Sequence, residues 1–390
     1  MNIAMTDEQR LLVETARRFV DEELIPLEEP LEKAGHLAPE IQRAIFAKSK
    51  ELGLYATNIP AELGGGGLSC VDTCLVEEQF GRTSDILIRR AFGNVYEVLL
   101  LATEAQRARW LVPTVAGERT FSVAFTEPEA GSDAASVRTR ATRADQGWLI
   151  NGQKTFISDG QFSDFFVVSA VTEPGAGARG ISLFIIDKGT PGLTLGPDQR
   201  MMGLTGTSHV PLYFDNVEAG PGHLLGQEGH GLKHALETLG RIRLAHIGAR
   251  AIGKATRLLE MMTDYAGMRR QFGKPIGENQ MVGQMLADSA MEIMSARLLV
   301  LNTAAMIDRG LDAREHISMV KVHAAEMLGR VADRAVQVHG GMGFCRDLPI
   351  ERFYRDARIF RIYDGTSEIH RSVIARALLK QGSRRLVDIV

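Results

Sequence analysis

The chain is poor in cysteine, and its few cysteines are not arranged to share a metal ion or to form a disulfide framework. Cys70, Cys74 and Cys345 make an odd, sparse set without CxxC spacing. Such a set is typical of a reducing compartment and argues against a zinc site. We therefore expect a cytoplasmic protein that binds no metal.

Long apolar runs and a dominant charge are missing as well. No run of about 18 apolar residues occurs, so we expect no membrane span. The net charge of -3 gives no electrostatic case for nucleic acid or for an anionic membrane surface. The amino-terminal stretch MNIAMTDEQR is acidic and polar and leads into no apolar segment, so we expect no signal peptide.

What the chain does contain divides it into three parts. Its 390 residues are enough for two or three domains. Apolar residues recur at helical spacing behind a capping-box signature, Thr6 and Gln9, and predict a helical domain over residues 1–120. Short β-type runs bounded by Gly, Pro and Asp predict a β domain over 121–225. Long helical patterns return in 226–390, so the expected fold class is multidomain α+β.

Local patterns place the expected elements. We expect helices at residues 39–52, 70–81, 85–101, 104–116, 232–268, 279–309, 313–338, 349–359 and 367–381. The helix at 232–268 would span roughly 55 Å, so part of it should pack on another long helix of this chain or of a second subunit. Asn151-Gly152 predicts a tight hairpin, because a type I′ turn needs two positive φ angles.

The Gly-rich stretch from Ile59 to Ser69 carries four consecutive glycines. Such a loop could cradle a phosphate with its backbone N–H groups, or it could be a flexible turn before the next helix. We favour the turn, because no Lys-Ser/Thr pair follows as a P-loop requires.

Two stretches of the β domain could carry chemistry, and each also has a plain structural interpretation. The loop from Phe125 to Asp133 could turn backbone N–H groups and hydroxyls towards a flat polar heterocycle, or it could be an ordinary turn. Phe156 and Ser158 share a strand face, where they could stack on a ring and bond its edge. A half-buried strand has the same pattern.

Three more stretches lie in the carboxy-terminal region. Arg269–Pro275 carries cations that could bind a pyrophosphate, although cations are also favoured at helix carboxyl ends. Gly340-Gly341 could bring backbone amides close to a ligand or simply cap the preceding helix. The turn Tyr363–Thr366 places the carboxylate of Asp364 before a helix, where it could act as a base or belong to a cap.

Taken together, eight ordered blocks resemble the acyl-CoA dehydrogenase family over nearly the whole chain. The blocks read TDEQRLLVETARRFV, IPAELGGGGLS, ATEAQRARWLVP, FTEPEAGSD, NGQKTFIS, RRQFGKPIGENQ, VQVHGGMGF and RDARIFRIYDGTSEIHR. The resemblance implies an α-helical N-terminal domain, a β-barrel middle domain and a C-terminal four-helix bundle. It also implies a homotetramer (or a dimer) with FAD at a subunit interface.

The activity implied by the resemblance is FAD-dependent α,β-dehydrogenation of an acyl-CoA thioester to the 2-enoyl-CoA. A base would take the α-proton, and the β-hydrogen would leave as hydride to flavin N5. An electron-transfer flavoprotein would then reoxidise the FAD.

The resemblance also assigns positions residue by residue. The cofactor-binding positions are Phe125, Thr126, Ser132, Phe156, Ser158, Arg269, Phe272, Gln280, Gln337, Gly340, Gly341, Thr366 and Glu368. The substrate-binding positions are Ser132, Arg243, Tyr363 and Gly365. Within the cofactor-binding set, the residues from Arg269 to Gly341 would reach the FAD of a neighbouring subunit, and Arg243 would contact the CoA part.

The implied catalytic base is Asp364, where most members of the family carry glutamate. A second group of members carries the base on the long helix, where this chain has Ile242, which has no acidic group. Because aspartate is one methylene shorter, three functions stay open. They are dehydrogenation of an atypical acyl-CoA such as a branched or cyclic one, oxidation as in nitroalkane oxidases, and binding of FAD and CoA ligands with little turnover. Asp85 and Glu97 are the next candidate carboxylates, and we expect both to be solvated surface residues.

Overall fold

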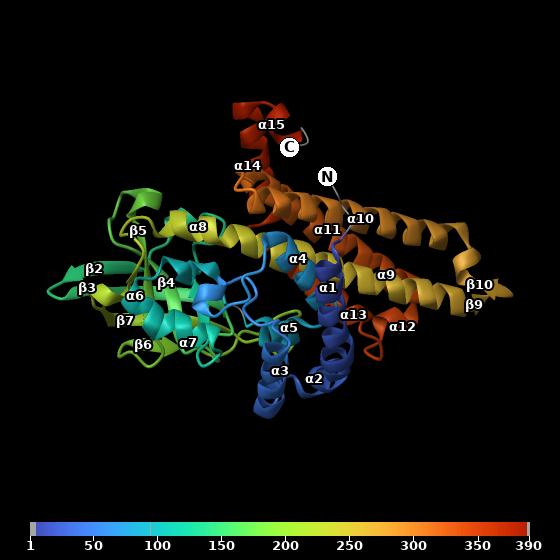
Figure 1. Ribbon diagram of the computed structural model, residues 1–390, viewed down its shortest axis with the longest axis horizontal. Coiled ribbons are helices and arrows are strands. Elements are labelled where there is room, and N and C mark those ends of the chain that lie inside the picture. The colour runs from blue at the N-terminus through green and yellow to red at the C-terminus, as the bar shows by residue number, and fades with distance from the viewer. Residues whose placement is uncertain (1–4, 94, 388–390) are drawn as a thin grey trace.

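The structure is a computed structural model that describes residues 5–93 and 95–387. Residues 1–4 lie outside the described residues. They begin the stretch MNIAMTDEQR, which we expect not to be a signal peptide. The β domain forms one end of the molecule, and long carboxy-terminal helices extend from it to the opposite end (Figure 1). The amino-terminal helices pack along the side of these long helices.

The amino-terminal region is helical, as expected. Its α-helices are α1 (Asp7–Phe19), α2 (Glu28–Ala34), α3 (Pro39–Glu51), α4 (Cys70–Phe80), α5 (Asp85–Phe92), α6 (Glu104–Gln106) and α7 (Val112–Val115). Short 3-10 and π segments join them, namely η1 (Val20–Leu24), η2 (Ile25–Leu27), η3 (Ala61–Leu63), η4 (Glu97–Leu101) and η5 (Arg107–Leu111). The predicted capping box is present, because Thr6 and Gln9 exchange side-chain and backbone hydrogen bonds.

The prediction of a single helix over residues 85–101 is wrong. Helix α5 ends at Phe92, because Gly93 takes a left-handed conformation with φ 93° and its N–H donates to the carbonyl of Arg89. The chain continues as the separate short segment η4. A glycine that closes a helix is a C-cap, and the apolar spacing on both sides of it concealed this signal.

The Gly-rich loop is a turn, as favoured above. The N–H groups of its four consecutive glycines donate to backbone carbonyls within the loop or just before it, in the pairs Gly64 to Ala61, Gly65 to Pro60, Gly66 to Ala56 and Gly67 to Ile59. These donors are therefore occupied, and the phosphate-cradle interpretation is wrong.

The middle region is the predicted β domain. Its strands are β1 (Phe121–Ala124), β2 (Arg140–Ala144), β3 (Gly147–Ser158), β4 (Phe165–Val171), β5 (Ile181–Asp187), β6 (Leu193–Leu195), β7 (His209–Ala219) and β8 (Leu224–Leu225). They form an eight-stranded sheet in the order β6-β7-β3-β2-β4-β5-β8, and β1 pairs with β4. Three short 3-10 segments lie between them, η6 (Ala134–Ser136), η7 (Gly177–Gly180) and η8 (Pro221–His223).

The hairpin expected at Asn151-Gly152 is wrong, because both residues lie inside the continuous strand β3. The register against β7 shifts between Ile150 and Gly152, which marks a bulge. The Asn151 side chain accepts from the backbone N–H of Asn216 at 2.8 Å and so occupies the irregular pairing. At Gly152 a Cβ would lie 2.6 Å from the Cα of Thr139, so only glycine fits.

The carboxy-terminal region is built from long helices. Its α-helices are α8 (Gly231–Ile242), α9 (Arg250–Met268), α10 (Gln280–Asp308), α11 (Arg314–His339), α12 (Gly341–Phe344), α13 (Ile350–Ala357), α14 (Ser367–Gln381) and α15 (Arg384–Val387). The remaining elements are η9 (Arg243–Ala249), β9 (Arg270–Gln271), β10 (Lys274–Pro275), η10 (Ile276–Glu278) and η11 (Arg358–Arg361). The π-helical segment η9 joins α8 and α9 into the one long helix that was expected, and this helix packs on α10 and α11.

Helix α10 is unusual for a helix of a folded domain. By length and composition it could cross a membrane, yet only 33% of its apolar window is buried in this chain. Its exposed apolar side chains include Met281, Met291 and Met294. One such helix is weak evidence for a membrane span, so the expectation that nothing spans a membrane stays a prediction.

Buried ion pairs join the amino-terminal helices to the long helix. The carboxylate of Glu28 on α2 accepts from both terminal nitrogens of Arg257 on α9, at 2.7 and 2.9 Å. Glu77 on α4 pairs with Arg250. Both carboxylates are buried, and these pairs therefore fix where the amino-terminal helices lie against α9.

Candidate active site

Asp364 lies in the turn between η11 and α14, as expected. Its backbone φ is 53°, a left-handed conformation that a residue other than glycine rarely adopts. Thr366 is the N-cap of α14, and its hydroxyl accepts from the N–H of Ile369 at 3.2 Å. The cap interpretation of this turn is therefore confirmed. A strained residue beside a cap is also the kind of feature that occurs at active sites.

Two donors hold the backbone carbonyl of Asp364. The Nε of Arg243 donates to it at 2.8 Å, and Nε2 of His370 lies 3.1 Å from it. Burial lowers the pKa of His370 to about 4, so its ring is neutral near pH 7. Because a carbonyl only accepts, Nε2 must carry the proton. The other ring nitrogen, Nδ1, then accepts from the hydroxyl of Ser318 at 3.0 Å.

The carboxyl group of Asp364 is tuned towards neutrality. Burial raises its pKa above the ordinary value, and the nearby cations Arg243, Lys321 and Arg89 offset only part of that rise. Lys321 on α11 is itself buried and its Nζ has no hydrogen-bond partner among the described residues. Burial lowers the pKa of Lys321 to about 8. A carboxylate with a raised pKa is a better match for a general base near neutral pH.

The predicted flavin-facing residues of the β domain lie together at one edge. The N–H of Thr155 donates to the carbonyl of Thr126 at 2.9 Å, which brings the loop after β1 beside the end of β3. Phe156 has a positive φ of 58° and is 52% exposed, and its N–H donates to the side chain of Gln199. Phe125 and Ser158 are half-buried at the same edge.

A buried ion pair shapes the loop from Phe125 to Asp133. The Nζ of Lys154 on β3 lies 2.7 Å from the carboxylate of Glu127 and also donates to the carbonyl of Phe125. Burial would raise the pKa of Glu127, but the ammonium of Lys154 and the hydrogen bonds from Arg138 and Thr139 together lower it. The interpretation of this loop as an ordinary turn did not include this ion pair. Through its bond to the Phe125 carbonyl, Lys154 holds Phe125 in place.

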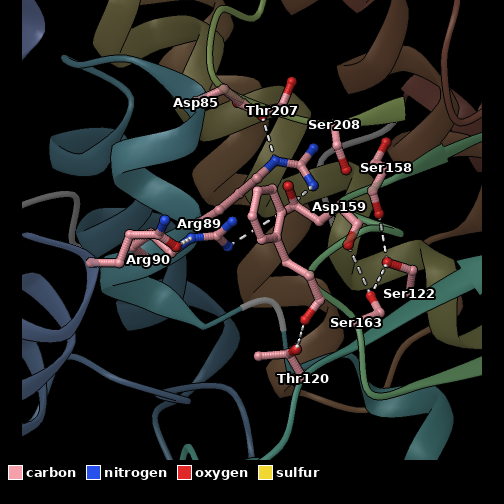
Figure 2. A network of polar contacts seen from close by, with 12 residues as sticks. Asp85, Arg89, Arg90, Thr120, Ser122, Ser158, Asp159, Ser163, Thr207 and Ser208 are labelled. Atoms are coloured by element: carbon pink, nitrogen blue, oxygen red, sulfur yellow. Dashed lines mark hydrogen bonds and ion pairs between the residues drawn. The ribbon is translucent and has the colours of Figure 1, made fainter. Parts of the chain in front are cut away.

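The position of Ser158 is set by a polar network between α5 and the β domain (Figure 2). The hydroxyl of Ser122 donates to the carbonyl of Ser158, and it also pairs with Ser163 at 2.7 Å. The neighbouring carboxylate of Asp159 lies 3.5 Å from Arg89 on α5. The amino-terminal domain therefore helps to hold the edge where the flavin is expected.

An apolar pocket lies between the loop before β7 and the segment from α13 to Ile362 that precedes Asp364. It is lined by Met201, Met202, Gly203, Leu204, Arg355, Arg358, Ile359 and Ile362. The N–H of Leu204 donates to the carboxylate of Asp356 on α13 at 2.6 Å and joins the two walls. An apolar pocket of this kind suits an apolar or aromatic group.

A second group of predicted cofactor residues lies away from the edge of the β domain. The positions Arg269, Phe272, Gln280, Gln337, Gly340 and Gly341 are all exposed. The hairpin β9–β10, with Phe272 at its tip, lies at the end of the molecule opposite the β domain (Figure 1). Phe272 is 97% exposed with φ 51°. Their contact with the cofactor of another subunit stays a prediction.

The other predicted residues surround the turn or lie near the loop. Tyr363, Gly365 and Thr366 flank Asp364 and are half-buried. Glu368 and Ser132 are exposed. The backbone of Glu368 and the hydroxyl of Thr366 lower the pKa of the Glu368 carboxyl, as in a helix cap. Their contacts with cofactor or substrate stay predictions.

Asp85 and Glu97 are not solvated surface residues, contrary to the expectation. Asp85 is 6% exposed and pairs with Arg89, and Glu97 is 7% exposed. Their helices pack against the β domain and the long helix, so these carboxylates are buried between elements distant in sequence. Lys321 is also buried near the site and carried no signal in the sequence beyond an ordinary helical pattern.

Comparison with protein families assigns all three regions. The acyl-CoA dehydrogenase N-terminal domain matches residues 6–118, the middle domain matches 122–217 and the C-terminal domain matches 229–379. An acyl-CoA dehydrogenase of Bacillus subtilis is 37% identical over 381 residues, covering 96% of this chain and 99% of the relative. The caffeyl-CoA reductase-Etf complex subunit CarC of Acetobacterium woodii is 34% identical over 387 residues, with coverage of 96% and 99%.

Solved structures agree with the sequence relatives. The butyryl-CoA dehydrogenase of Megasphaera elsdenii superposes with a TM-score of 0.90 at 32% identity, covering 97% of this chain and 100% of that chain. The helical, β and helical regions predicted above are thus confirmed. The chain therefore belongs to the acyl-CoA dehydrogenase family of flavoprotein oxidoreductases.

Proposed function

We propose that this chain dehydrogenates an acyl-CoA thioester between its α and β carbons, with Asp364 as the base that removes the α-proton. The observation that carries the proposal is the turn itself. Its only acidic side chain has a raised pKa and is attached to a backbone held by Arg243 and His370. A base fixed in this way can be placed on one proton of a bound substrate.

The same turn offers a group to polarise the thioester. Among the described residues, no acceptor is paired with the backbone N–H of Asp364. With the Asp364 carbonyl fixed by two donors, the orientation of the Tyr363–Asp364 and Asp364–Gly365 peptides is constrained. An N–H aimed at the thioester oxygen would stabilise the charge that develops there when the α-proton leaves. Arg243 would at the same time lie close to the CoA part, as the family resemblance implies.

The cofactor in this proposal is FAD, on which the family depends. When bound, FAD would supply the acceptor for the hydride that leaves the β carbon. Phe125, Thr126, Phe156 and Ser158 would hold its ring at the edge of the β domain, and the apolar pocket wall would exclude water from it. Thr366 and Glu368 would hold it from the substrate side.

The proposal includes a second subunit and a redox partner. Six predicted cofactor positions would complete the FAD site of a neighbouring copy in a homotetramer or dimer, as their exposure away from the β domain supports. They are Arg269, Phe272, Gln280, Gln337, Gly340 and Gly341. An electron-transfer flavoprotein would accept the electrons, which is supported by the relative that is itself a subunit of a reductase-Etf complex. We place the protein in the cytoplasm.

Anaerobic mixing with a panel of thioesters tests this function. Straight, branched and cyclic acyl-CoA compounds are compared by the loss of the visible absorbance of oxidised flavin. We expect at least one of them to bleach the flavin. Bleaching by nitroalkanes with peroxide release, and by no thioester, would instead favour an oxidase. Spectral shifts without bleaching across the panel would favour a binding protein with little turnover.

A further inference from the structure

A narrow pocket opens between the amino-terminal helices and the long helix. It is lined by Asn58, Cys70, Thr73, Phe92, Glu97, Arg241, Ile242, Ala245 and His246. Ile242 directly precedes Arg243, whose Nε holds the carbonyl of Asp364. A pocket residue and the residue that fixes the proposed base are therefore neighbours on the long helix.

Two oxygen atoms of this pocket have no partner. The Oε2 of Glu97 and the Oδ1 of Asn58 are buried without a hydrogen bond from any described residue. Glu97 is 7% exposed, and one N–H of the Asn58 amide donates to the carbonyl of Val95 at 2.9 Å. Buried acceptors are normally paired, so both oxygens are open to a donor on a bound ligand.

The charges around the pocket limit which donor fits. Arg241 lines the pocket. Burial raises the pKa of Glu97 above its ordinary value, and the side chain of Asn58 and the cation of Arg241 offset only part of that rise. His246 is neutral, because burial lowers the pKa of its ring well below the ordinary value. An ammonium group on the ligand would meet the guanidinium of Arg241. A carboxylate would meet the carboxyl oxygen of Glu97.

We propose that this pocket is a subsite for a neutral hydroxyl group on the acyl chain of the substrate. A hydroxyl can donate to Glu97 or Asn58 and accept from Arg241 with one atom, whereas a plain hydrocarbon end leaves both acceptors unpaired. The inference rests on the proposed function, because it takes the thioester end to lie at Asp364. It narrows the substrate class to hydroxylated acyl-CoA thioesters.

Matched substrate pairs test the subsite on the holoenzyme. Butyryl-, hexanoyl- and octanoyl-CoA are each compared with derivatives that carry a hydroxyl, an amino or a carboxyl group at or next to the terminal carbon. We expect kcat/KM for flavin reduction to be at least about tenfold higher for the best hydroxylated compound than for its unsubstituted partner. Equal values for all pairs, or a preference for the amino or carboxyl compound, would overturn the subsite.

Substitution separates the subsite from general damage. In Glu97→Leu the ratio of kcat/KM for the hydroxylated compound to kcat/KM for its unsubstituted partner should fall to near one. Glu97→Gln keeps an acceptor and should retain part of the preference. The control Glu104→Leu changes an exposed carboxylate on α6 and should leave the ratio unchanged. A ratio in Glu97→Leu equal to that of the unmodified enzyme would contradict the proposal.

A binding measurement keeps this test independent of turnover. Dissociation constants for the same pairs are measured with Asp364→Asn holoenzyme, from the shift of the flavin spectrum or by calorimetry. Tighter binding of the hydroxylated compound supports the subsite even if no thioester reduces the flavin, an outcome that would sink the dehydrogenase proposal alone. Equal binding together with normal flavin reduction would sink the subsite alone.

Discussion

Arg243 holds Asp364 by its backbone, since its Nε donates to the Asp364 carbonyl oxygen at 2.8 Å rather than to the carboxylate. An arginine bonded directly to the carboxylate would lower its basicity. Bonded to the carbonyl, it fixes the position of the base and still acts on the carboxylate through space. The pairing joins the long helix to the turn before α14, two segments far apart in sequence.

Substitution of Arg243 should therefore slow the reaction more than it weakens binding of FAD. In Arg243→Met the turn loses one of its two carbonyl donors, and a misplaced base can cost about a hundredfold in rate. We expect anaerobic flavin reduction to slow by about tenfold to a hundredfold, with flavin content retained. The matched control Arg376→Met, on the exposed face of α14, should reduce flavin at the unmodified rate. An equal rate in both variants would contradict the positioning role.

The pH dependence of flavin reduction should report the charge of Lys321. Asp364 must be ionised to take a proton, so the rate rises with pH through its pKa, which burial places above the ordinary aspartate value. Removing a nearby cation disfavours the ionised carboxylate and raises that pKa further. Lys321→Met should therefore move the acidic limb of the profile to higher pH.

The control for this shift is Lys233→Met, which removes an exposed lysine on α8. It should leave the acidic limb where it is in the unmodified protein. A limb that stays in place, or moves to lower pH, in Lys321→Met would show that Lys321 does not act on the base.

The pair of Glu127 and Lys154 should contribute to stability. Lys154 is fully buried, and Lys154→Met leaves the carboxylate of Glu127 buried without its ammonium partner. Losing one partner of a buried pair costs about 3 kcal/mol, to be measured by urea unfolding. The double variant Lys154→Met/Glu127→Gln should recover part of the loss, and Lys33→Met, from a surface pair, should cause no measurable change. A loss of stability in the double variant that equals or exceeds the summed losses of the two single variants would argue against direct coupling.

Assembly should depend on the hairpin at the far end of the helices. Phe272 is almost fully exposed at its tip, and a charge there would oppose contact with another subunit. We expect Phe272→Asp to yield smaller particles by light scattering and to lose FAD during gel filtration. Leu11→Asp, which changes an exposed leucine on α1, should do neither. An unchanged mass and full flavin content in Phe272→Asp would place the subunit contact elsewhere.

Much of the fold follows from local sequence patterns. The long helices and the change to β structure were predicted from periodicity, and the turn at Asp364 from the Asp-Gly signal before an N-cap threonine. Two local signals were misleading. Gly93 ends a helix, although apolar residues recur at helical spacing on both sides of it. Asn151-Gly152 marks a bulge and not a hairpin turn, and the Asn151 side chain there accepts from the backbone N–H of Asn216 on the partner strand.

The site was less predictable, because its decisive features arise between distant segments. Glu97 lines its pocket only because η4 packs on the long helix. The carbonyl of Asp364 is fixed only when the side chains of Arg243 and His370 both reach it. Such meetings depend on helix packing, whose register one sequence does not fix.

The most direct test of the central claim is the rate of anaerobic flavin reduction in Asp364→Asn holoenzyme, mixed with the best acyl-CoA of the panel. The amide keeps the size of the side chain and cannot take the α-proton. We predict that FAD stays bound and that the rate falls by at least about a hundredfold, while Asp364→Glu stays active. A rate near that of the unmodified enzyme in Asp364→Asn would contradict the account and move the base to another carboxylate, with Glu97 and Asp85 the first to examine.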